Sequence, residues 1–211
     1  MYCDQNVNLI PDASEISELK EGICPVDWAK NCIALAKKGN CGQSVMCRDG
    51  MTQLLILMED ITSGNGQPDD LELIKDLCTV ISESKGCEIS AKAASNVLYS
   101  MEKYYEEWDI HHRRKRCTAL VCKSYYSVYI DPELCTGCQA CAKAAPEGAI
   151  AGGEGMIHVV KDDSQIKNDE FFALCPVGAI KKAGAVKPRT PQEPVPVGSF
   201  DAAGGRRRRR R

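Results

Sequence analysis

Four of the 13 cysteines in this 211-residue chain form two groups whose spacing suits metal binding. Cys135, Cys138 and Cys141 make a C-x2-C-x2-C run, and Cys175 begins the segment Cys-Pro-Val-Gly-Ala-Ile at residues 175–180. Thiolates are soft, anionic donors, which match iron held in a sulfide cage. The spacing therefore predicts one [4Fe-4S] cluster on these four cysteines, with a single zinc ion on the same thiolates as the alternative.

An internal repeat supports this prediction. Residues 145–150, Ala-Pro-Glu-Gly-Ala-Ile, repeat residues 175–180 with alanine in place of the cysteine. Residues 124–182 thereby resemble the bacterial two-cluster ferredoxins, in which each half supplies three cysteines to one cluster and its Cys-Pro cysteine to the other. The resemblance implies a single cluster here, because the positions of the second ligand set hold residues that do not bind iron: Ala145, Gln165, Asn168 and Phe171.

A second cysteine set lies in the first half of the chain. Cys41 and Cys47 belong to the segment C-G-Q-S-V-M-C-R-D-G, and Cys87 follows Gly86. Over residues 24–182 the chain resembles the C-terminal iron-sulfur region of two related proteins. These are the NADH-oxidising flavoprotein subunit of respiratory complex I and its counterpart, the beta subunit, in electron-bifurcating hydrogenases. In this family the region is a four-helix bundle, and the hydrogenase form adds a ferredoxin-like domain after it.

The resemblance implies a second iron-sulfur cluster, bound by Cys41, Ser44, Cys47 and Cys87. The family has cysteine where this chain has Ser44, and a hydroxyl is a harder ligand that loses its proton far less readily than a thiol. A three-iron cluster on the three thiolates, and three buried thiols with no cluster, are the alternatives.

The hydrogenase relatives also suggest a zinc site near the end of the bundle. The candidate ligands are Cys24, His111, Cys117 and Cys122, a Cys3His set that meets the tetrahedral preference of zinc. Alternatively, His111 simply ends a helix beside the basic residues 113–116, where positive charge favours the C-terminal end of the helix dipole.

Periodic apolar residues predict the helices that position these sites. They recur with helical spacing over four segments, and a β-type run follows at residues 125–130. The fold class expected is α+β, a four-helix bundle followed by a small ferredoxin-like domain. The expected helices are residues 25–38, 51–61, 70–83 and 90–108. The expected parts are an N-terminal arm (1–24), the bundle (25–114), a linker that carries the zinc ligands (115–123), the ferredoxin-like domain (124–184) and a disordered tail (185–211).

Composition excludes several classes of protein. An odd cysteine count without a signal-peptide pattern argues against a disulfide scaffold, and the longest apolar run, residues 54–58, is too short to cross a bilayer. Six of the 27 basic residues form the arginine run 206–211, which we interpret as a tag or solvated tail. The rest of the chain has 21 basic residues and 29 acidic ones, so it carries a net negative charge. We therefore expect a cytoplasmic protein that neither binds nucleic acid nor inserts into a membrane.

The resemblance implies an iron-sulfur electron-transfer subunit of an NAD(P)H- or ferredoxin-linked oxidoreductase. Such a subunit relays electrons between a flavin on a partner chain and another carrier or catalytic subunit. The sequence shows no nucleotide-binding glycine motif and no hydrolytic triad, paired-carboxylate or H-E-x-x-H pattern, so we do not expect an enzyme on its own. A structural adaptor whose metals only hold the fold, and a stand-alone ferredoxin-type carrier, are the two other functions that fit.

Overall fold

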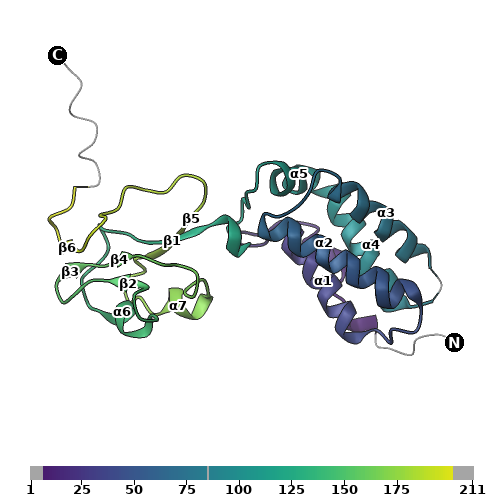
Figure 1. The fold of residues 1–211 in the computed structure, drawn as a ribbon, viewed down its shortest axis with the longest axis horizontal. Coiled ribbons are helices and arrows are strands. Elements are labelled where there is room, and N and C mark those ends of the chain that lie inside the picture. Colours follow the sequence, from purple (N-terminus) through teal and green to yellow (C-terminus); the bar gives the residue numbers. More distant parts are fainter. Residues whose placement is uncertain (1–6, 85, 202–211) are drawn as a thin grey trace, which may run out of the picture. The chain divides into compact units, whose positions relative to one another are not determined.

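The computed structural model describes residues 7–84 and 86–201, which belong to two compact units (Figure 1). The first unit, Met1–Tyr125, is helical, and the second, Tyr126–Arg211, contains short strands and two short helices. The chain is therefore α+β, as predicted. No helix among the described residues is long and apolar enough to span a membrane.

Five α-helices make up most of the described part of the first unit. Most of the apolar side chains that recur along them at spacings of three and four residues are buried. The helices are α1 (Pro25–Gly39), α2 (Met51–Ser63), α3 (Asp70–Glu83), α4 (Glu88–Lys103) and α5 (Tyr105–Arg113), accompanied by the short turns η1 (Val7–Leu9), η2 (Ala13–Ile16), η3 (Met46–Gly50) and η4 (Lys123–Tyr125).

The helix ends follow from local chemistry. Helix α1 begins with Pro25 in its first position, where no backbone N–H is required, and the sulfur of Cys24 accepts a hydrogen bond from the Asp27 backbone N–H. Helix α2 ends at Gly64, whose φ of 91° is the left-handed conformation that glycine adopts most readily. These two ends place Cys24 at a helix start and turn the chain towards α3.

Helices α1 to α4 pack around one apolar core. Helix α1 contacts α2 and α4, helix α3 contacts the same two helices, and α5 packs on α1, α2 and α4. Complete burial of the large side chains that line this core is the main stabilising contribution. They include Ile33, Met51, Leu54, Met58, Ile61, Ile74, Ile81, Ile89 and Trp108.

The expected fourth helix, residues 90–108, is in fact two helices. The backbone breaks at Tyr104, with φ −121° and ψ 39°, and the Tyr104 hydroxyl donates a hydrogen bond to the Ile16 carbonyl. Tyr105, the first residue of α5, is 59% exposed. The prediction of one continuous helix was therefore wrong. The helix breaks at the residue whose side chain binds the distant N-terminal segment, and a local sequence pattern does not contain that contact.

Two segments outside the helices belong to the first unit. The N-terminal arm buries Ile10 and Ile16, and Lys92 and Asn96 of α4 donate hydrogen bonds to backbone carbonyls of the arm, each at 2.8 Å. Residues 115–123, expected as a linker, also lie within this unit and lead into η4. Both segments therefore extend the helical unit at its ends.

The second unit contains an approximate internal repeat. Strand β1 (Ser127–Ile130) pairs with β5 (Ile180–Ala183), and β2 (Ile150–Ala151) pairs with β4 (Val159–Val160), both antiparallel. Each half thus has a strand, a short helix and a second strand, and the first strand of one half pairs with the last strand of the other. The short helices are α6 (Ala140–Ala144) and α7 (Asp169–Ala173).

The expectation of a disordered tail over residues 185–211 was wrong in part. Strand β6 (Val195–Pro196) pairs with β3 (Met156–Ile157), and Lys161 binds the Gln192 carbonyl and the Glu193 carboxylate, both at 2.8 Å. Backbone pairing with a distant hairpin orders this proline-rich stretch, which composition could not indicate. Residues 202–211, including the terminal arginines, lie outside the described residues.

Candidate metal centres

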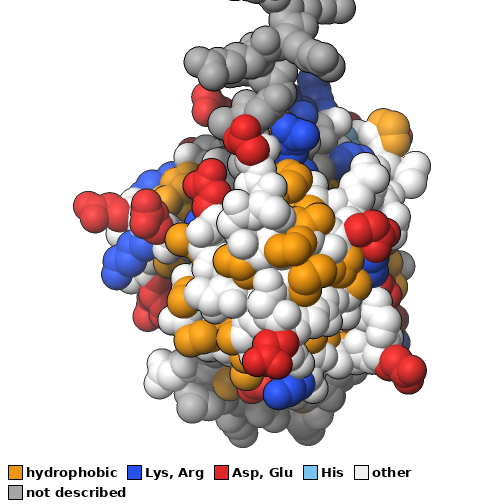
Figure 2. Space-filling model, turned by 90° about the vertical axis from the view of Figure 1, so that its left-hand side faces the viewer, with side chains coloured by type: hydrophobic (Ala, Val, Ile, Leu, Met, Phe, Trp, Pro, Cys, Tyr) orange, Lys and Arg blue, Asp and Glu red, His pale blue; other side chains and the backbone are white. Residues whose placement is uncertain are grey.

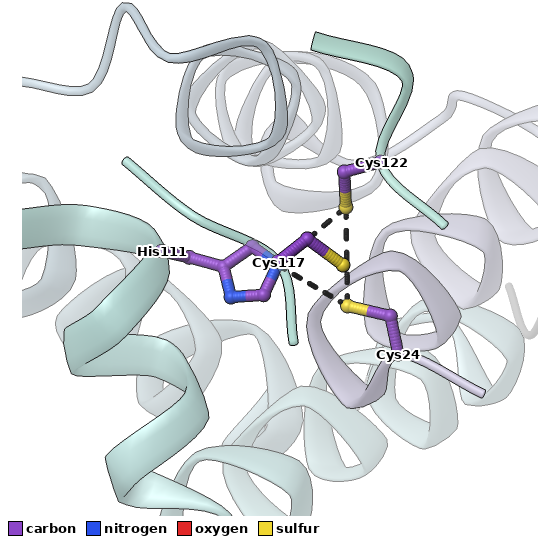
Figure 3. A group of neighbouring side chains, drawn as sticks. All are labelled: Cys24, His111, Cys117 and Cys122. Atoms are coloured by element: carbon purple, nitrogen blue, oxygen red, sulfur yellow. Dashed lines mark hydrogen bonds between the residues drawn. The ribbon is translucent and has the colours of Figure 1, made fainter. Parts of the chain in front are cut away.

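Three thiols and one imidazole converge in the first unit (Figure 3). The donor atoms of Cys24, His111, Cys117 and Cys122 all lie within 4.8 Å of one another, and each residue is at most 3% exposed. Cys24 stands at the start of α1, His111 lies in α5, and Cys117 and Cys122 belong to the segment after α5. These are the four residues that the sequence predicted as candidate zinc ligands.

The distances among these donors match one tetrahedral metal ion. Bonds of about 2.3 Å to sulfur and about 2.0–2.1 Å to nitrogen place ligand sulfurs about 3.8 Å apart and sulfur and nitrogen about 3.6 Å apart. The Cys24 and Cys122 sulfurs are 3.8 Å apart, and His111 Nε2 lies 3.3 Å from the first and 3.5 Å from the second. The donor set and its spacing therefore fit zinc.

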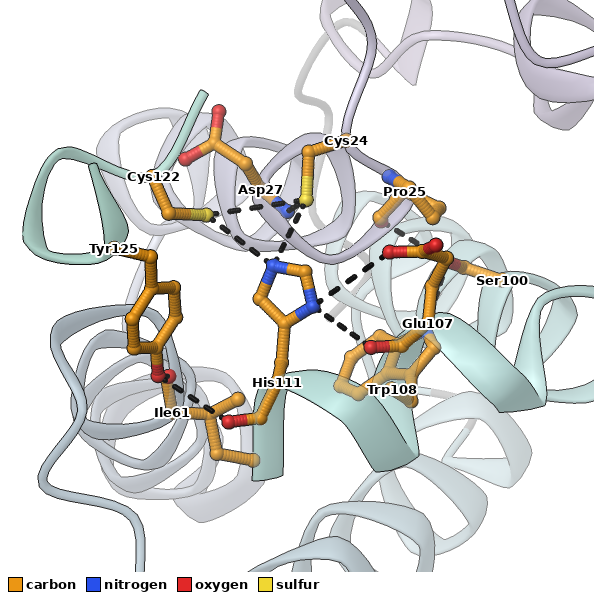
Figure 4. Close-up of polar contacts among 10 residues, drawn as sticks. All are labelled: Cys24, Pro25, Asp27, Ile61, Ser100, Glu107, Trp108, His111, Cys122 and Tyr125. Atoms are coloured by element: carbon orange, nitrogen blue, oxygen red, sulfur yellow. Dashed lines mark hydrogen bonds and ion pairs between the residues drawn. The ribbon is translucent and has the colours of Figure 1, made fainter. Parts of the chain in front are cut away.

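Surrounding groups orient the His111 ring (Figure 4). Its Nδ1–H donates to the Glu107 carbonyl at 2.7 Å, and the Glu107 carboxylate lies 3.9 Å from the same nitrogen. In the neutral ring that bond keeps the proton on Nδ1 and leaves the Nε2 lone pair free, the usual arrangement around a metal-binding histidine. The ring also makes an edge contact with Tyr125, whose hydroxyl donates to the Ile61 carbonyl.

A buried hydrogen-bond chain joins the elements that carry Cys24 and His111. The Trp108 indole N–H donates to the Ser100 hydroxyl at 3.1 Å, and that hydroxyl donates to the Pro25 carbonyl at 3.0 Å (Figure 4). This chain fixes α5 and the first turn of α1 against α4. The adjacent His112 contacts the Gln67 carbonyl and does not belong to this group of donors.

Close packing perturbs the protonation of the four groups. Hydrogen bonds with Cys122 and Cys24 lower the pKa of the Cys117 thiol, whereas hydrogen bonds with Cys117 and Cys24 raise the pKa of the Cys122 thiol. Burial lowers the pKa of His111, but its contacts with Cys117 and Cys24 outweigh this and raise it to about 10. Metal binding at this site releases protons, because a ligand imidazole must be neutral and ligand thiols must be thiolates.

The second cysteine set lies around η3, a short π-helical turn of the kind often found at functional sites. The Gly42 backbone N–H donates to the Cys47 sulfur at 3.3 Å. Burial raises the pKa of the Cys47 thiol, and the adjacent Cys87 thiol raises it further. Cys47 and Cys87 are therefore neighbours, although 40 residues separate them in the sequence.

Ser44 also belongs to this neighbourhood. Its hydroxyl accepts a hydrogen bond from the Cys47 backbone N–H at 3.1 Å, and it faces Gly86, the residue before Cys87. The Asn40 side chain donates to the Cys47 carbonyl at 2.7 Å, which ties the loop to the end of α1. Cys41 is partly exposed at the start of this loop.

The third cysteine set lies in the second unit. Gly137 and Gln139, between the three clustered cysteines, have φ values of 72° and 63° and wind the loop. A Cβ at Gly137 would lie 2.8 Å from the Gly155 backbone, so only glycine fits there. Burial raises the pKa of the Cys141 thiol to about 11, and the nearby thiols of Cys135 and Cys138 raise it as well.

Cys175 lies in the other half of the repeat. The Ala179 backbone N–H donates to its sulfur at 3.2 Å, the type of N–H···S bond that stabilises a cluster thiolate. Strand β1, which precedes Cys135, pairs with β5, which follows Cys175. The pairing thus joins the two segments that carry the expected ligands.

Two of the four positions equivalent to a second ligand set have structural roles. The Asn168 side chain accepts a hydrogen bond from the Phe171 backbone N–H at 2.8 Å and caps α7, and Phe171 is buried. A single cluster in the second unit stays a prediction.

Sequence reasoning missed His158, which lies between β3 and β4. The residue is 2% exposed, its Nδ1 lies 3.8 Å from the Cys135 sulfur, and burial lowers its pKa. The one feature of the sequence that could have indicated a role for His158 is its position within the otherwise apolar segment 156–160. Nothing in the local sequence shows that the ring faces a cysteine 23 residues earlier.

Comparison with known proteins supports two iron-sulfur regions. Residues 27–111 match the NADH-ubiquinone oxidoreductase-F iron-sulfur binding region, and residues 128–150 match the 4Fe-4S binding domain. The HndC subunit of the NADP-reducing hydrogenase of Solidesulfovibrio fructosivorans is 30% identical over 140 residues, which cover 66% of this chain and 29% of the relative.

The F-type subunits of two NADH-quinone oxidoreductases are also similar to this chain. That of Streptomyces coelicolor is 32% identical over 78 residues, which cover 37% of this chain and 17% of the relative. That of Escherichia coli is 29% identical over 82 residues, 39% of this chain and 18% of the relative. The chain thus spans less than a third of the length of these relatives. The chain thus contains two regions similar to known iron-sulfur proteins, one like the NADH-ubiquinone oxidoreductase-F iron-sulfur binding region and the other like a 4Fe-4S binding domain.

Proposed function

We propose that this chain is an iron-sulfur electron-transfer subunit of a flavin-dependent oxidoreductase complex. It relays electrons between a flavin on a partner chain and another carrier or catalytic subunit. The observation that carries the proposal is the thiol set Cys135, Cys138, Cys141 and Cys175, which lies in a duplicated fold with one complete ligand set and one replaced by structural residues.

Cys135, Cys138, Cys141 and Cys175 hold a [4Fe-4S] cluster in this proposal. Bound there, the cluster supplies one-electron transfer at a potential set by burial and by hydrogen bonds to its sulfurs. The Ala179 N–H supplies one such bond to Cys175, and Cys135 and Cys141 are buried. Cys138 is exposed and marks the side open to solvent or to a partner.

Cys41, Ser44, Cys47 and Cys87 hold the second cluster. The Gly42 N–H bond to the Cys47 sulfur and the closeness of Cys47 to Cys87 support this assignment. Ser44 occupies the place of the missing thiol, facing Gly86. A hydroxyl binds iron less readily than a thiolate at neutral pH, so we expect this cluster to lose iron more easily than the other.

The Cys3His site holds zinc and has a structural role. Zinc has no redox chemistry, and four protein ligands leave no open position for a substrate. The ion connects α1, α5 and the segment that ends the first unit, so it stabilises the end of the bundle. A metal-stabilised adaptor is the second candidate function, and this buried site is the observation that favours it.

The surface of the second unit is suited to partner binding. One face gathers hydrophobic side chains, with acidic and basic side chains around them (Figure 2). Exposed large hydrophobic residues of this unit include Leu134, Leu174 and Val177, which are close in sequence to the cysteine ligands. Apolar surface of this kind commonly marks a docking site, as a relay between subunits requires.

Anaerobic purification tests the proposal. We expect about four to eight irons per chain, with matching acid-labile sulfide and a reducible visible absorption band, from one or two [4Fe-4S] clusters. We also expect one zinc that stays bound when the iron is oxidised away. A relay subunit should co-purify with a flavoprotein, whereas a stand-alone carrier should purify alone. A colourless protein with zinc and no iron would support the adaptor function instead.

A further inference from the structure

His158 is a buried polar side chain that neither the repeat nor the ligand sets explain. It is 2% exposed, and its Nδ1 lies 3.8 Å from the Cys135 sulfur, within reach of an N–H···S hydrogen bond. Its other nitrogen, Nε2, has no hydrogen-bond partner in the described part of the chain. Burying an imidazole without full pairing costs free energy, so a compensating interaction is expected.

The hairpin that carries His158 holds the ring in place. A Cβ at Gly152 would lie 2.4 Å from the ring carbon Cδ2, and Gly152 has a φ of 155°, so only glycine leaves room for the imidazole. The neighbouring residues Ile157 and Val159 are paired in β3 and β4. A cavity of about 10 Å³, lined in part by His158, Tyr129 and Thr190, is about the size of one water molecule that could pair with Nε2.

We propose that His158 is a positioning residue that sets the reduction potential of the ferredoxin-type cluster through a hydrogen bond from Nδ1–H to the Cys135 sulfur. This inference rests on the proposed binding of a cluster by Cys135. A cluster thiolate can only accept a hydrogen bond, so the ring nitrogen that faces it must carry the proton. The second nitrogen then accepts a hydrogen bond from water in the adjoining cavity.

The direction of the effect follows from charge. One-electron reduction adds a negative charge that is spread over the cluster and its sulfurs, and an N–H donor stabilises that charge more than it stabilises the oxidised state. Removing the donor should therefore make the reduction potential more negative. Keeping a donor at the same place should preserve the potential.

Two variants of nearly equal shape separate the hydrogen bond from the packing. In the full chain, H158L removes the donor, and H158N keeps an N–H group near the position of Nδ1. The signal of the ferredoxin-type cluster is identified as the one that Cys138→Ala removes. In an anaerobic redox titration followed by electron paramagnetic resonance, H158L should titrate at a more negative potential than the wild type, and H158N should stay close to the wild type.

Equal midpoint potentials in H158L and the wild type, with equal iron content, would overturn this inference and leave the proposed function standing. An iron-free wild-type chain would instead refute the proposed function itself. If neither variant retains a cluster, a measurement on the wild-type protein tests the hydrogen bond instead. Labelled with 15N-histidine and reduced, it should show nitrogen coupling to this cluster in pulsed resonance spectra, and the lack of that coupling would overturn the inference. His111 and His112 belong to the first unit and contact other groups.

Discussion

Removing one zinc ligand should destabilise the first unit far more than removing an equally buried cysteine on the same helix. Cys24 and Cys32 are 2% and 0% exposed, one at the start of α1 and the other inside it. Only Cys24 belongs to the Cys3His cluster, whereas Cys32 accepts a hydrogen bond from Asn96 at 3.7 Å. Replacing each with alanine removes the same atoms, so the difference between the two variants contains the contributions of the metal and of the cap at the Asp27 N–H.

The structure allows the magnitudes to be worked out. Loss of one buried sulfur costs about 1 kcal/mol in either variant. Cys24→Ala also removes the N-terminal cap that the sulfur provides for the Asp27 N–H, which is worth about 1 kcal/mol more. A metal that binds only the folded chain, at a free concentration a thousand times its dissociation constant, adds about 4 kcal/mol. Cys24→Ala should therefore exceed Cys32→Ala by about 5 kcal/mol.

Thermal unfolding followed by circular dichroism, together with zinc analysis, checks this difference. At roughly 4 °C per kcal/mol for a unit of this size, Cys32→Ala should lower the midpoint by about 4 °C and Cys24→Ala by more than 20 °C. Cys24→Ala should also lose the zinc that Cys32→Ala keeps. If the variants differ by only about 1 kcal/mol, which the cap explains, and the wild type holds no zinc, the reasoning is refuted.

Three other predictions concern the iron sites and one ion pair. Cys138→Ala should remove about four irons per chain, whereas Cys78→Ala, which removes a buried thiol of α3, should leave the iron content unchanged; equal iron loss would contradict the ligand assignment. Ser44→Cys should make the bundle cluster retain its iron longer in air, and unchanged decay would show that Ser44 does not face the cluster. Lys181, at 2.7 Å, lowers the pKa of Asp131. Asp131→Asn should therefore lower the free energy of unfolding by about 0.5–1 kcal/mol at pH 7. Chemical denaturation at a series of pH values should show that this difference shrinks near and below pH 4, because acid protonates the wild-type carboxyl there and removes the stabilising charge.

Much of the fold followed from local patterns. Periodic apolar residues placed α1, α2 and α3 within two residues of their observed ends, because proline, glycine and charged residues start and stop helices locally. The division of the expected fourth helix could not be predicted, since it accompanies a hydrogen bond from Tyr104 to a carbonyl 88 residues earlier. Strand β6 was missed for the same reason, because its partner is a distant hairpin.

The sequence by itself determined the chemistry of this protein. Cysteine spacing, the Cys-Pro-x-Gly-Ala-Ile repeat and the replaced second ligand set indicate an iron-sulfur protein, because ligand type and spacing within a loop are local properties. Only the tertiary structure decided which distant groups meet. The family resemblance suggested that Cys24, His111, Cys117 and Cys122 form one site, and the structure brought their donor atoms within 4.8 Å of one another. It also placed the ring of His158 beside Cys135, which no sequence pattern indicated. Such contacts depend on how whole elements pack, and packing is a sum over many side chains that no short stretch of sequence contains.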